Sequence, residues 1–340
     1  MAITIREIAE KANVSTATVS MVLNSKPGIS EQTRRRVFDI VESFGYNVSP
    51  LKSSMLKHNG TLQLTIYRKH SQVVADTAFF EALIAGIENT ARQSGYQLIV
   101  KSVTGDKLTA DLVIPDHNGN SIDGILLLGT EMDEQDMLSA MDIQYPLLIL
   151  DTRFLGVRSN FVVIDNVCGV YIGVKHLIEI GHREIGYLKS SIAIENFDER
   201  FEGYLKAMDS CGLDVDELYT IPLRPTIDGA YEDMSYYMSF NPKIPTAFFA
   251  DNDIIACGAM KALKEAGVKI PEDVSIIGFD DMPLCTIIEP ALSTIAVNKK
   301  MLGTLAVEKL IGLISAKEEN HSTTLLGVDL IIRESIKPPK

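Results

Sequence analysis

The strongest constraint on the fold of this chain is an alternation of short apolar runs with amphipathic helical stretches, which begins near residue 61. A strand inside a parallel sheet is apolar on both faces, whereas a covering helix is apolar along one stripe. The pattern therefore predicts an α/β fold with parallel sheets covered by helices on both faces. The runs that predict strands are residues 62–67, 97–103, 125–128, 147–150, 161–164, 185–188, 246–249 and 274–278.

Two of the intervening stretches show helical spacing and end at a glycine. Residues 81–94 place apolar side chains three and four positions apart and stop at Gly95, and residues 167–180 do the same and stop at Gly181. Glycine just past the last helical residue is a common helix end. Both stretches are predicted to be helices that cover a sheet.

Acidic or amide residues follow several of the predicted strands. Because ligands bind at the carboxyl ends of parallel strands in open α/β sheets, these residues are candidates for a polar ligand site. The alternative is that they cap the helices that follow, which we expect for Asp165, Asp253 and Asp281. The full set is Asp151, Asp165, Asp251, Asn252, Asp253, Asp280 and Asp281.

The first 46 residues are organised differently, with three short helices predicted at residues 5–12, 16–23 and 31–44. Ser15 and Ser30 are suited to cap the second and third helices. A tight turn between the first two helices is typical of a helix-turn-helix, whose second helix enters the major groove of DNA. The alternative is a three-helix domain with no DNA-binding role.

The distribution of charge favours a DNA-binding end. The whole chain carries a net charge of -13, but residues 1–60 hold eight Lys and Arg against five Asp and Glu, which leaves +3 for this segment and -16 for the remainder. Arg34 and its two neighbours are expected near the start of the third helix, where they would contact phosphates without reading sequence. The charge excludes a general nucleic-acid coat protein but permits a site-specific reader.

The amino-acid sequence of residues 4–24 closely resembles the DNA-binding headpiece of the lac repressor (LacI/GalR) family of bacterial transcription regulators. The string that carries the resemblance is Val14-Ser15-x-x-Thr18-Val19-Ser20-x-Val22-x-Asn24. It implies that Thr16, Ala17 and Met21 occupy the base-reading positions, where Ala17 and Met21 offer apolar contact. The DNA-binding residues expected from the resemblance are Thr4, Ser15, Thr16, Ala17, Ser20, Met21, Asn24, Arg34, Met55 and Leu56.

Residues 47–60 match the family's hinge, which forms a short helix on operator DNA and inserts an apolar side chain into the minor groove. The resemblance assigns that side chain to Met55, with Leu56 beside it. The segment departs from the family pattern, because residues 48–49 and 52–53 replace the usual Pro-Asn and Ala-Arg pairs. An inert linker is therefore the alternative for this segment.

Residues 61–340 resemble the family's effector-binding and dimerisation core, which is similar to periplasmic sugar-binding proteins. The motifs that carry this resemblance are His176-Leu-Ile-Glu-Ile-Gly-His182-Arg, Arg200-Phe-Glu-Gly203-Tyr204, Ala250-Asp-Asn252-Asp253, Ile277-Gly-Phe-Asp280-Asp281 and Arg333-Glu-Ser335. They imply two Rossmann-like lobes, one at 61–160 plus 292–322 and the other at 161–291 plus 323–340. The effector is expected in the cleft between the lobes, in contact with Phe79, Phe80, Asp151, Arg200, Asn252 and Asp280.

The side chains of this expected site suggest the kind of effector. An arginine flanked by carboxylates and an amide suits the hydroxyl groups of a neutral sugar or polyol. Arg153 and Arg224 would instead favour a sugar acid or a phosphate if they faced the cleft. The chain holds no Trp, so any stacking on a ligand would use Phe or Tyr. We expect a sugar-like effector and retain a purine or nucleoside co-repressor as the alternative.

Other classes of protein find little support in the sequence. A nucleophile elbow, a P-loop and a HExxH motif are all missing, so no enzymatic activity, metal or cofactor is expected. The apolar runs are too short to span a membrane, and the N-terminus lacks a secretory signal. A cytoplasmic regulator is therefore favoured over a sugar-binding transport protein, which would need a secretory signal. The four widely spaced cysteines are expected to be reduced thiols.

We therefore predict a homodimeric repressor of a carbohydrate-use operon, with a headpiece at 1–46, a hinge at 47–60 and a core at 61–340. Each headpiece would read one half of a pseudo-palindromic operator. Effector binding in the core would control operator affinity, and the coupling between the two sites would be reciprocal.

Overall fold

The computed structural model describes residues 5–23, 29–30, 32–33, 36–37, 40, 60–74, 78–114, 121–315 and 321–340. The chain divides into two compact units, Met1–Asn59 and Gly60–Lys340, and each is described by itself. Within the described residues, every helix is too short or too polar to cross a membrane.

The first unit contains α1 (Ile5–Ala12) and α2 (Thr16–Leu23), joined by a turn in which Asn13 has a left-handed backbone with φ of 51°. Ser15 caps α2, because its Oγ accepts the Thr18 N–H at 3.0 Å. The two helices and the cap confirm the sequence prediction. The buried side chains of this unit's core are Ile8, Ala9, Ala12, Val19, Val22 and Val37.

The third predicted helix, residues 31–44, lies largely outside the described residues. Just before it, Ser30 Oγ accepts the Thr33 N–H at 3.3 Å, as a helix cap does. Val37 belongs to the core of this unit, and Ile40 packs against it. The described part of the segment is therefore consistent with a third helix that closes the small core.

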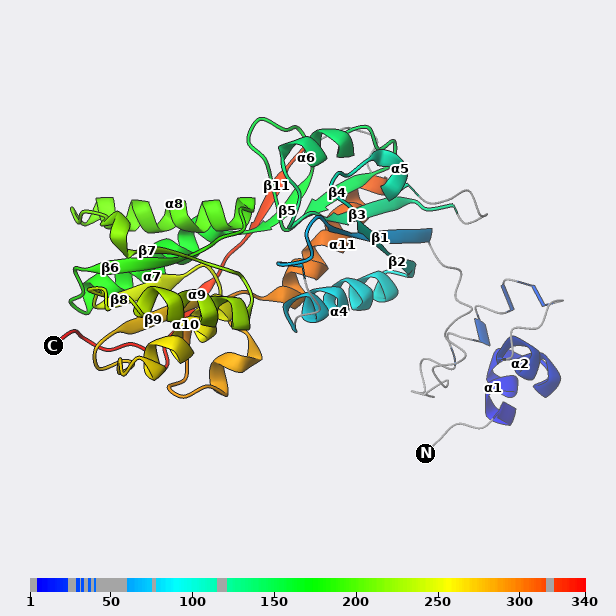
Figure 1. Cartoon of the computed structure of the whole chain (residues 1–340). Coiled ribbons are helices and arrows are strands. Elements are labelled where there is room, and N and C mark those ends of the chain that lie inside the picture. The colour runs from blue at the N-terminus through cyan, green and yellow to red at the C-terminus, as the bar shows by residue number, and fades with distance from the viewer. Residues whose placement is uncertain are drawn as a thin grey trace. The chain divides into compact units, whose positions relative to one another are not determined.

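The second unit is built on two sheets, one parallel and one parallel except for an edge strand (Figure 1). The first sheet has the strand order β11-β5-β4-β3-β1-β2, and every pairing in it is parallel. Its strands are β1 (Gly60–Arg68), β2 (Tyr96–Thr104), β3 (Gly124–Leu128), β4 (Leu147–Leu150), β5 (Phe161–Ile164) and β11 (Thr323–Leu326). Its helices are α4 (Ala78–Gln93), α5 (Ala110–Val113), α6 (Glu134–Ala140) and α11 (Lys299–Ser315).

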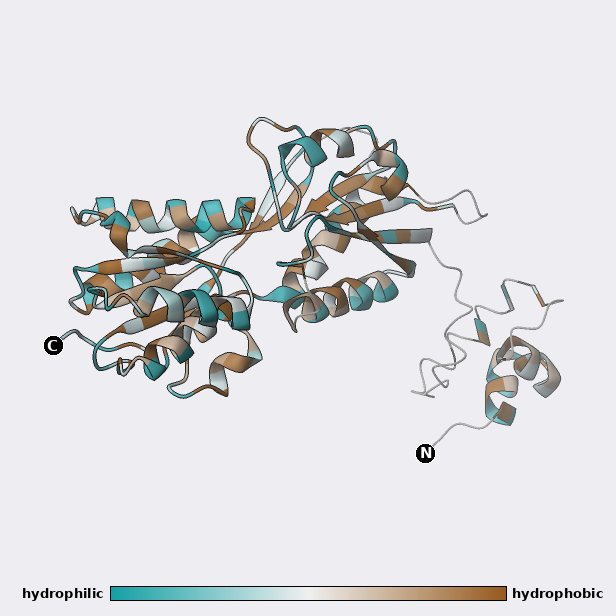
Figure 2. Cartoon of the chain, viewed as in Figure 1, coloured by the Kyte–Doolittle hydropathy of each residue, from teal (hydrophilic) through white to brown (hydrophobic). Residues whose placement is uncertain are grey.

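Both faces of this sheet are covered, as the apolar runs predict. Successive side chains of β3 point to opposite faces, so Leu126 and Leu128 pack with α4 and α11, whereas Ile125 and Leu127 pack in a separate cluster on the side of α5 and α6. In Figure 2 the strands are mostly hydrophobic, and the helices carry hydrophobic and hydrophilic residues in alternation.

The second sheet has the strand order β12-β10-β9-β8-β6-β7, in which only the edge strand β12 runs antiparallel among the described pairings. Its strands are β6 (Ile185–Ser190), β7 (Thr220–Leu223), β8 (Ala247–Ala250), β9 (Ser275–Asp280), β10 (Ser293–Ala296) and β12 (Asp329–Ile331). Its helices are α7 (Asn166–Glu179), α8 (Glu195–Ser210), α9 (Ile227–Met238) and α10 (Asp253–Glu265), with the short 3-10 helices η2 (Glu217–Tyr219) and η3 (Pro283–Thr286).

The chain crosses between the two lobes three times: after β5, after β10 and after β11. The first lobe therefore keeps residues 161–164 and 323–326, and the second keeps 293–296. This differs from the boundaries expected from the sequence, which placed each crossing before the strand concerned. The physical reason is that β5 pairs with β4 and β11, while β10 pairs with β9 and β12.

Candidate functional site

A cavity of about 300 Å³ lies between the lobes, at the carboxyl ends of strands from both sheets. Its volume is at the lower end of the ~300–1,000 Å³ of ordinary small-molecule sites, which suits a ligand of monosaccharide size. The structure brings together all six residues that the sequence assigned to the effector: Phe79, Phe80, Asp151, Arg200, Asn252 and Asp280.

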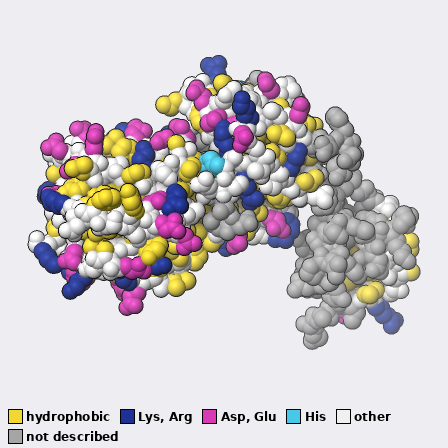
Figure 3. Space-filling view, in the orientation of Figure 1, with side chains coloured by type: hydrophobic (Ala, Val, Ile, Leu, Met, Phe, Trp, Pro, Cys, Tyr) yellow, Lys and Arg dark blue, Asp and Glu magenta, His cyan; other side chains and the backbone are white. Residues whose placement is uncertain are grey.

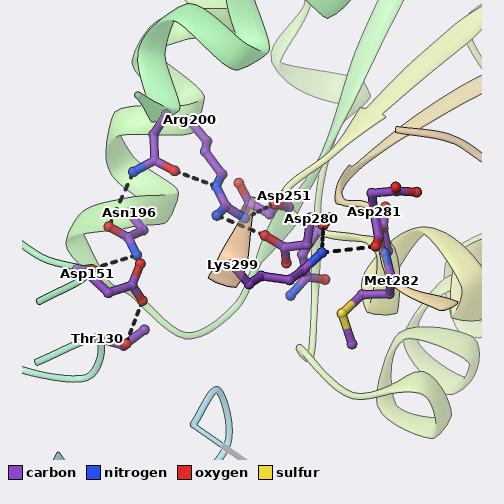
Figure 4. Close-up of polar contacts among 12 residues, drawn as sticks. Thr130, Asp151, Asn196, Arg200, Asp251, Asp280, Asp281, Met282 and Lys299 are labelled. Carbon is purple, nitrogen blue, oxygen red and sulfur yellow. Dashed lines mark hydrogen bonds and ion pairs between the residues drawn. The ribbon is translucent and has the colours of Figure 1, made fainter. Parts of the chain in front are cut away.

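Arg200 is the central cation of this cavity. It projects from the first half of α8 and is only 3% exposed. Its guanidinium donates to Asn166 Oδ1 at 2.9 Å, to the Asp251 backbone carbonyl at 2.6 Å and to Asp280 Oδ1 at 3.3 Å (Figure 4). One face of the guanidinium lies 3.7 Å from the centre of the Phe279 ring. These contacts fix the guanidinium before any ligand arrives.

Asp151 follows β4 with a left-handed backbone, at φ of 66°, and it is 2% exposed. Its Oδ2 accepts the Thr130 hydroxyl at 2.6 Å, and its backbone carbonyl accepts the Asn196 amide at 2.9 Å. Its Oδ1 has no hydrogen-bond partner among the described residues. Burial raises the pKa of this carboxyl to about 6. A buried acceptor without a partner is costly, so a ligand donor at Oδ1 would be stabilising.

Asp280 ends β9 on the opposite wall, with φ of 109°. Its carboxylate faces Arg200, and its backbone carbonyl accepts a hydrogen bond from Lys299. Burial raises the pKa of the Asp280 carboxyl, and Arg200 and Lys299 oppose that effect. Asp151 and Asp280 thus present two carboxylates that flank the Arg200 guanidinium.

Asn252 lines the cavity and also caps α10, because its Oδ1 accepts the Ile255 N–H at 2.9 Å. A ligand would therefore meet its amide group. The prediction that Asp253 caps this helix is wrong, since Asp253 lies one residue inside α10. Its buried carboxylate accepts the Thr294 hydroxyl and the Met282 N–H instead, and burial raises its pKa to about 7.

The other two predicted caps have different outcomes. Asp165 caps α7, where its Oδ1 accepts the Cys168 N–H at 3.3 Å, as predicted. Asp281 does not cap a helix, because the residue before η3 is Met282. The Asp281 carboxylate accepts a hydrogen bond from Arg333 at 2.6 Å instead. That ion pair ties the end of β9 to the segment after β12.

Phe79 and Phe80 form the aromatic wall on the first lobe. Both lie in the first turn of α4, with ring centroids 5.1 Å apart in an edge-to-face arrangement. The second lobe adds Phe197, Ile227 and further apolar side chains to the lining. The cavity therefore combines a polar end with an apolar wall, as sites that bind the two faces of a sugar or a base do.

The two arginines that would have indicated an anionic ligand are used elsewhere. Arg153 pairs with Glu199 at 2.8 Å, and Arg224 pairs with Asp233 and Glu232 on the surface. Neither lines the cavity. On the face drawn in Figure 3, acidic side chains are spread over the unit Gly60–Lys340 and alternate with Lys and Arg.

Sequence reasoning missed Thr130, Asn196 and Lys299 as neighbours of this cavity. Asn196 precedes Arg200 by four residues, so helical spacing alone places the two side chains on one face of α8. Thr130 follows β3, which pairs with β4, so it lies beside Asp151 at the same end of the first sheet. The position of Lys299 beside β9 depends on how the lobes approach each other, which no pattern along the chain encodes.

The candidate DNA-binding face lies on α2. Ser15, Thr16 and Ala17 are exposed, and Ser20 and Met21 are partly exposed. The buried residues of the same helix, Val19 and Val22, point into the core, so the predicted base-reading side chains share the outer surface. The remaining predicted contacts, Thr4, Asn24, Arg34, Met55 and Leu56, lie outside the described residues.

A helix-turn-helix unit joined in sequence to a two-lobed core with a polar interlobe cavity defines a ligand-controlled DNA-binding regulator. Residues 4–49 match the model of the bacterial regulatory proteins of the lacI family, and residues 174–336 match the periplasmic binding protein-like domain. The chain is 30% identical over 335 residues to the ribose operon repressor of Haemophilus influenzae, with 98% of each protein covered. The chain belongs to the lacI family, whose members are DNA-binding transcriptional regulators and not enzymes.

Other similar proteins include a second repressor and two solved structures with a bound ligand. The chain is 31% identical over 346 residues to the transcriptional repressor PurR of Haemophilus influenzae, with 98% of each covered. Its structure is similar to a regulator, CelR, in complex with cellobiose (25% identity, TM-score 0.71, 98% of this chain and 99% of that one). It is also similar to a LacI family regulator of Enterococcus faecium with bound ribose (27% identity, TM-score 0.68, 82% and 100% covered).

Proposed function

We propose that the interlobe cavity of this repressor binds a neutral, polyhydroxylated effector of pentose size, and that its binding changes the affinity for operator DNA. The observation that carries the proposal is the buried Oδ1 of Asp151, which has no hydrogen-bond partner in the part of the chain that the structure describes and lies on the wall opposite the Arg200–Asp280 pair. A sugar hydroxyl can donate to a carboxylate and accept from a guanidinium at once. A ring of hydroxyls would therefore satisfy both walls of the cavity.

The charge of the cavity argues against an anionic effector. Of the described residues that line it, Asp151, Asp228 and Asp280 carry carboxylates, and Arg200 alone carries a cationic side chain. That guanidinium already donates to three protein acceptors. A phosphate or carboxylate would have to be desolvated beside these acids with little compensation.

A purine co-repressor is the second candidate. Phe79, Phe80 and Phe197 place aromatic rings around the cavity, and such rings can stack on a base. PurR relatives also support this alternative. The two candidates predict opposite signs of control: a sugar inducer weakens operator binding, whereas a co-repressor strengthens it.

We further propose that the protein acts in the cytoplasm as a homodimer on a pseudo-palindromic operator. Strand β2 is an edge of the first sheet, and its Val100 side chain is 51% exposed. The edge of a sheet presents backbone groups with which a second copy of the chain can pair. Two-fold symmetry would then present two recognition helices to two half-sites.

D-Ribose is expected to raise the unfolding temperature of the full chain, whereas ribose 5-phosphate and D-ribonate at the same concentration leave it unchanged. A ligand at 100 times its Kd stabilises the folded state by ~2.7 kcal/mol. Thermal-shift scans with these three compounds and hypoxanthine check this. A shift with ribose 5-phosphate but not with ribose would contradict the neutral-ligand proposal, and a shift with hypoxanthine alone would favour the purine alternative.

The affinity for D-ribose is expected to increase as the pH rises towards 6 and to level off above it. The pKa of the free Asp151 carboxyl is raised to about 6, and a hydroxyl that donates to Oδ1 stabilises the carboxylate, so the pKa is lower in the complex. Ligand therefore binds the ionised form better. One pH unit below the free pKa, roughly a tenth of the carboxyl is ionised, so the affinity falls ~10-fold.

Calorimetric titration at a series of pH values measures this dependence. The Asp151→Asn variant removes the titrating group and serves as the control, since any residual pH dependence must come from other carboxyls. An affinity that is flat or that increases on acidification would contradict the assigned role of Asp151.

A further inference from the structure

Lys299 lies where the chain re-enters the first lobe, as the first residue of α11. Its Nζ donates to the backbone carbonyls of Asp280 and Asp281 at the end of β9 in the second lobe, the latter at 2.9 Å (Figure 4). The same ammonium lies 5.8 Å from the centre of the Phe79 ring on α4. One side chain thus contacts the cavity walls of both lobes.

The backbone that Lys299 holds is unusual. Asp280 and Asp281 are consecutive non-glycine residues with φ of 109° and 53°. This region of backbone space is unfavourable for such residues and persists only where surrounding contacts hold it. Lys299 supplies such contacts to both carbonyls. The Asp280 residue therefore carries two functional groups: a carboxylate that faces Arg200 and the cavity, and a carbonyl that is bound to Lys299.

Helix α11 connects Lys299 to the body of the first lobe. It packs against α4, which carries Phe79 and Phe80, and it contacts β3, β4 and β5. Strand β1, in the same sheet, begins at Gly60, directly after the segment that leads from the headpiece. A displacement of the start of α11 therefore acts on the whole lobe to which the DNA-binding unit is attached in sequence.

We propose that Lys299 is a positioning residue that couples occupancy of the cavity to the relative orientation of the two lobes. This rests on the effector role proposed above. A ligand that attracts the Asp280 carboxylate moves the end of β9, and Lys299 transmits that movement to α11. Because the coupling is reciprocal, the orientation that operator DNA favours also biases the position of Asp280 and the affinity for ligand.

The neighbouring contacts distinguish this role from simple bracing. Arg333 also binds the end of β9, but its hydrogen bonds to the Asp281 carboxylate and to the Leu292 carbonyl stay within the second lobe. Lys309 lies on the same helix as Lys299 and also donates to a carbonyl, that of Ser322, at 2.9 Å, but this bond stays within the first lobe. Lys309→Met is therefore a matched control for Lys299→Met.

The experiment uses the full chain with its exposed Cys168 and its partly exposed Cys211 replaced by serine. Spin labels are attached at Leu138→Cys in the first lobe and Leu218→Cys in the second, both exposed positions. Pulsed electron paramagnetic resonance gives the distribution of distances between the lobes with and without D-ribose. Calorimetry gives the Kd for D-ribose in the same variants.

We expect D-ribose to shift the interlobe distance in the parent protein and in Lys309→Met. In Lys299→Met the ribose-induced shift should disappear even at ribose concentrations that saturate this variant, as set by the Kd that calorimetry measures for it. The conservative variant Lys299→Arg keeps donors at this position and should restore part of the shift. A variant that had merely lost packing would not bind D-ribose and yet lack the ribose-induced change in interlobe distance.

The failure of this proposal is distinguishable from the failure of the effector proposal. If the parent protein does not bind D-ribose, the effector proposal fails, and Lys299 is judged on the ligand-free protein. Lys299→Met should then broaden the ligand-free distance distribution relative to the parent and to Lys309→Met. If Lys299→Met does not fold, Lys299→Gln takes its place in both comparisons. The proposal is overturned if a Lys299 variant has the same distribution of interlobe distances as the parent. Where ribose binds, it must also show the same ribose-induced shift as the parent.

Discussion

Replacing Ala17 with glutamate is expected to abolish operator binding while D-ribose binding persists. Ala17 is exposed on the first turn of α2, the second helix of the helix-turn-helix. A carboxylate at this position would keep the helix from approaching the base edges and would be repelled by the phosphates. We expect a loss of at least about 100-fold in operator affinity, ~2.8 kcal/mol at 1.4 kcal/mol per tenfold.

The substitution should not unfold the headpiece. Position 17 lies in the first turn of α2, after the Ser15 cap, where a negative charge is favourable to the helix. Gel shifts use a DNA fragment that the parent protein selects from a random pool. Ala266→Glu, at an exposed position after α10, adds the same charge to the core and is the matched control. If Ala17→Glu shifts the fragment as the control does, α2 is not the reading helix.

The central strands of both sheets could be predicted from the sequence because they are buried on two faces. Strands β4 and β5 match the predicted runs to the residue. The strands that were missed lie mainly at edges or carry polar side chains. Strand β7 contains Pro222, and β11 and β12 are half-exposed edges. Strand β10 is buried but carries the polar residues Ser293 and Thr294, so it does not read as an apolar run. These side chains are satisfied by hydrogen bonds with the Arg333 N–H and the Asp253 carboxylate.

The candidate site was predictable for a related reason. The carboxyl ends of parallel strands meet at one edge of each sheet, so Asn252 after β8 and Asp280 at the end of β9 gather without any knowledge of the loops. Asp151 follows β4 in the other sheet, and its approach to them was implied only by the family resemblance. What the sequence did not provide was which oxygens remain unbonded. Asp151 and Asp253 look alike in the sequence, but Thr294 and Met282 occupy the oxygens of Asp253, whereas Asp151 keeps one oxygen without a partner among the described residues.

The same distinction applies to the arginines. Arg153, Arg200 and Arg224 are all candidate ligand-binding cations in the sequence, and each of them pairs with acids in the structure. Only Arg200 of these three does so inside the cavity. The signal in the sequence that separates Arg200 from the other two is the family motif Arg200-Phe-Glu-Gly203-Tyr204, to which neither Arg153 nor Arg224 belongs.

Replacing Arg200 with alanine is expected to abolish the response to D-ribose while operator binding persists. Hydrogen bonds to a charged group contribute ~1.5–3 kcal/mol each, and the guanidinium can fork onto two hydroxyls, so a loss of at least about 100-fold in ribose affinity follows. Without Arg200, the pKa of the Asp280 carboxyl should rise further, because the cation opposes the effect of burial. The second wall would then lose its charged acceptor as well.

Arg153→Ala is the matched control for this variant, because it also removes an arginine paired with a carboxylate near the cleft but does not touch the cavity lining. Calorimetry with D-ribose and gel shifts with the selected DNA fragment are run on both proteins. If Arg200→Ala loses both functions, the buried guanidinium is needed for folding. Arg200→Lys, which keeps the charge but cannot bind two hydroxyls in the manner of a guanidinium, then tests the ligand role. A lysine variant that restores DNA binding without ribose binding supports the ligand role, whereas full ribose affinity in either variant contradicts it.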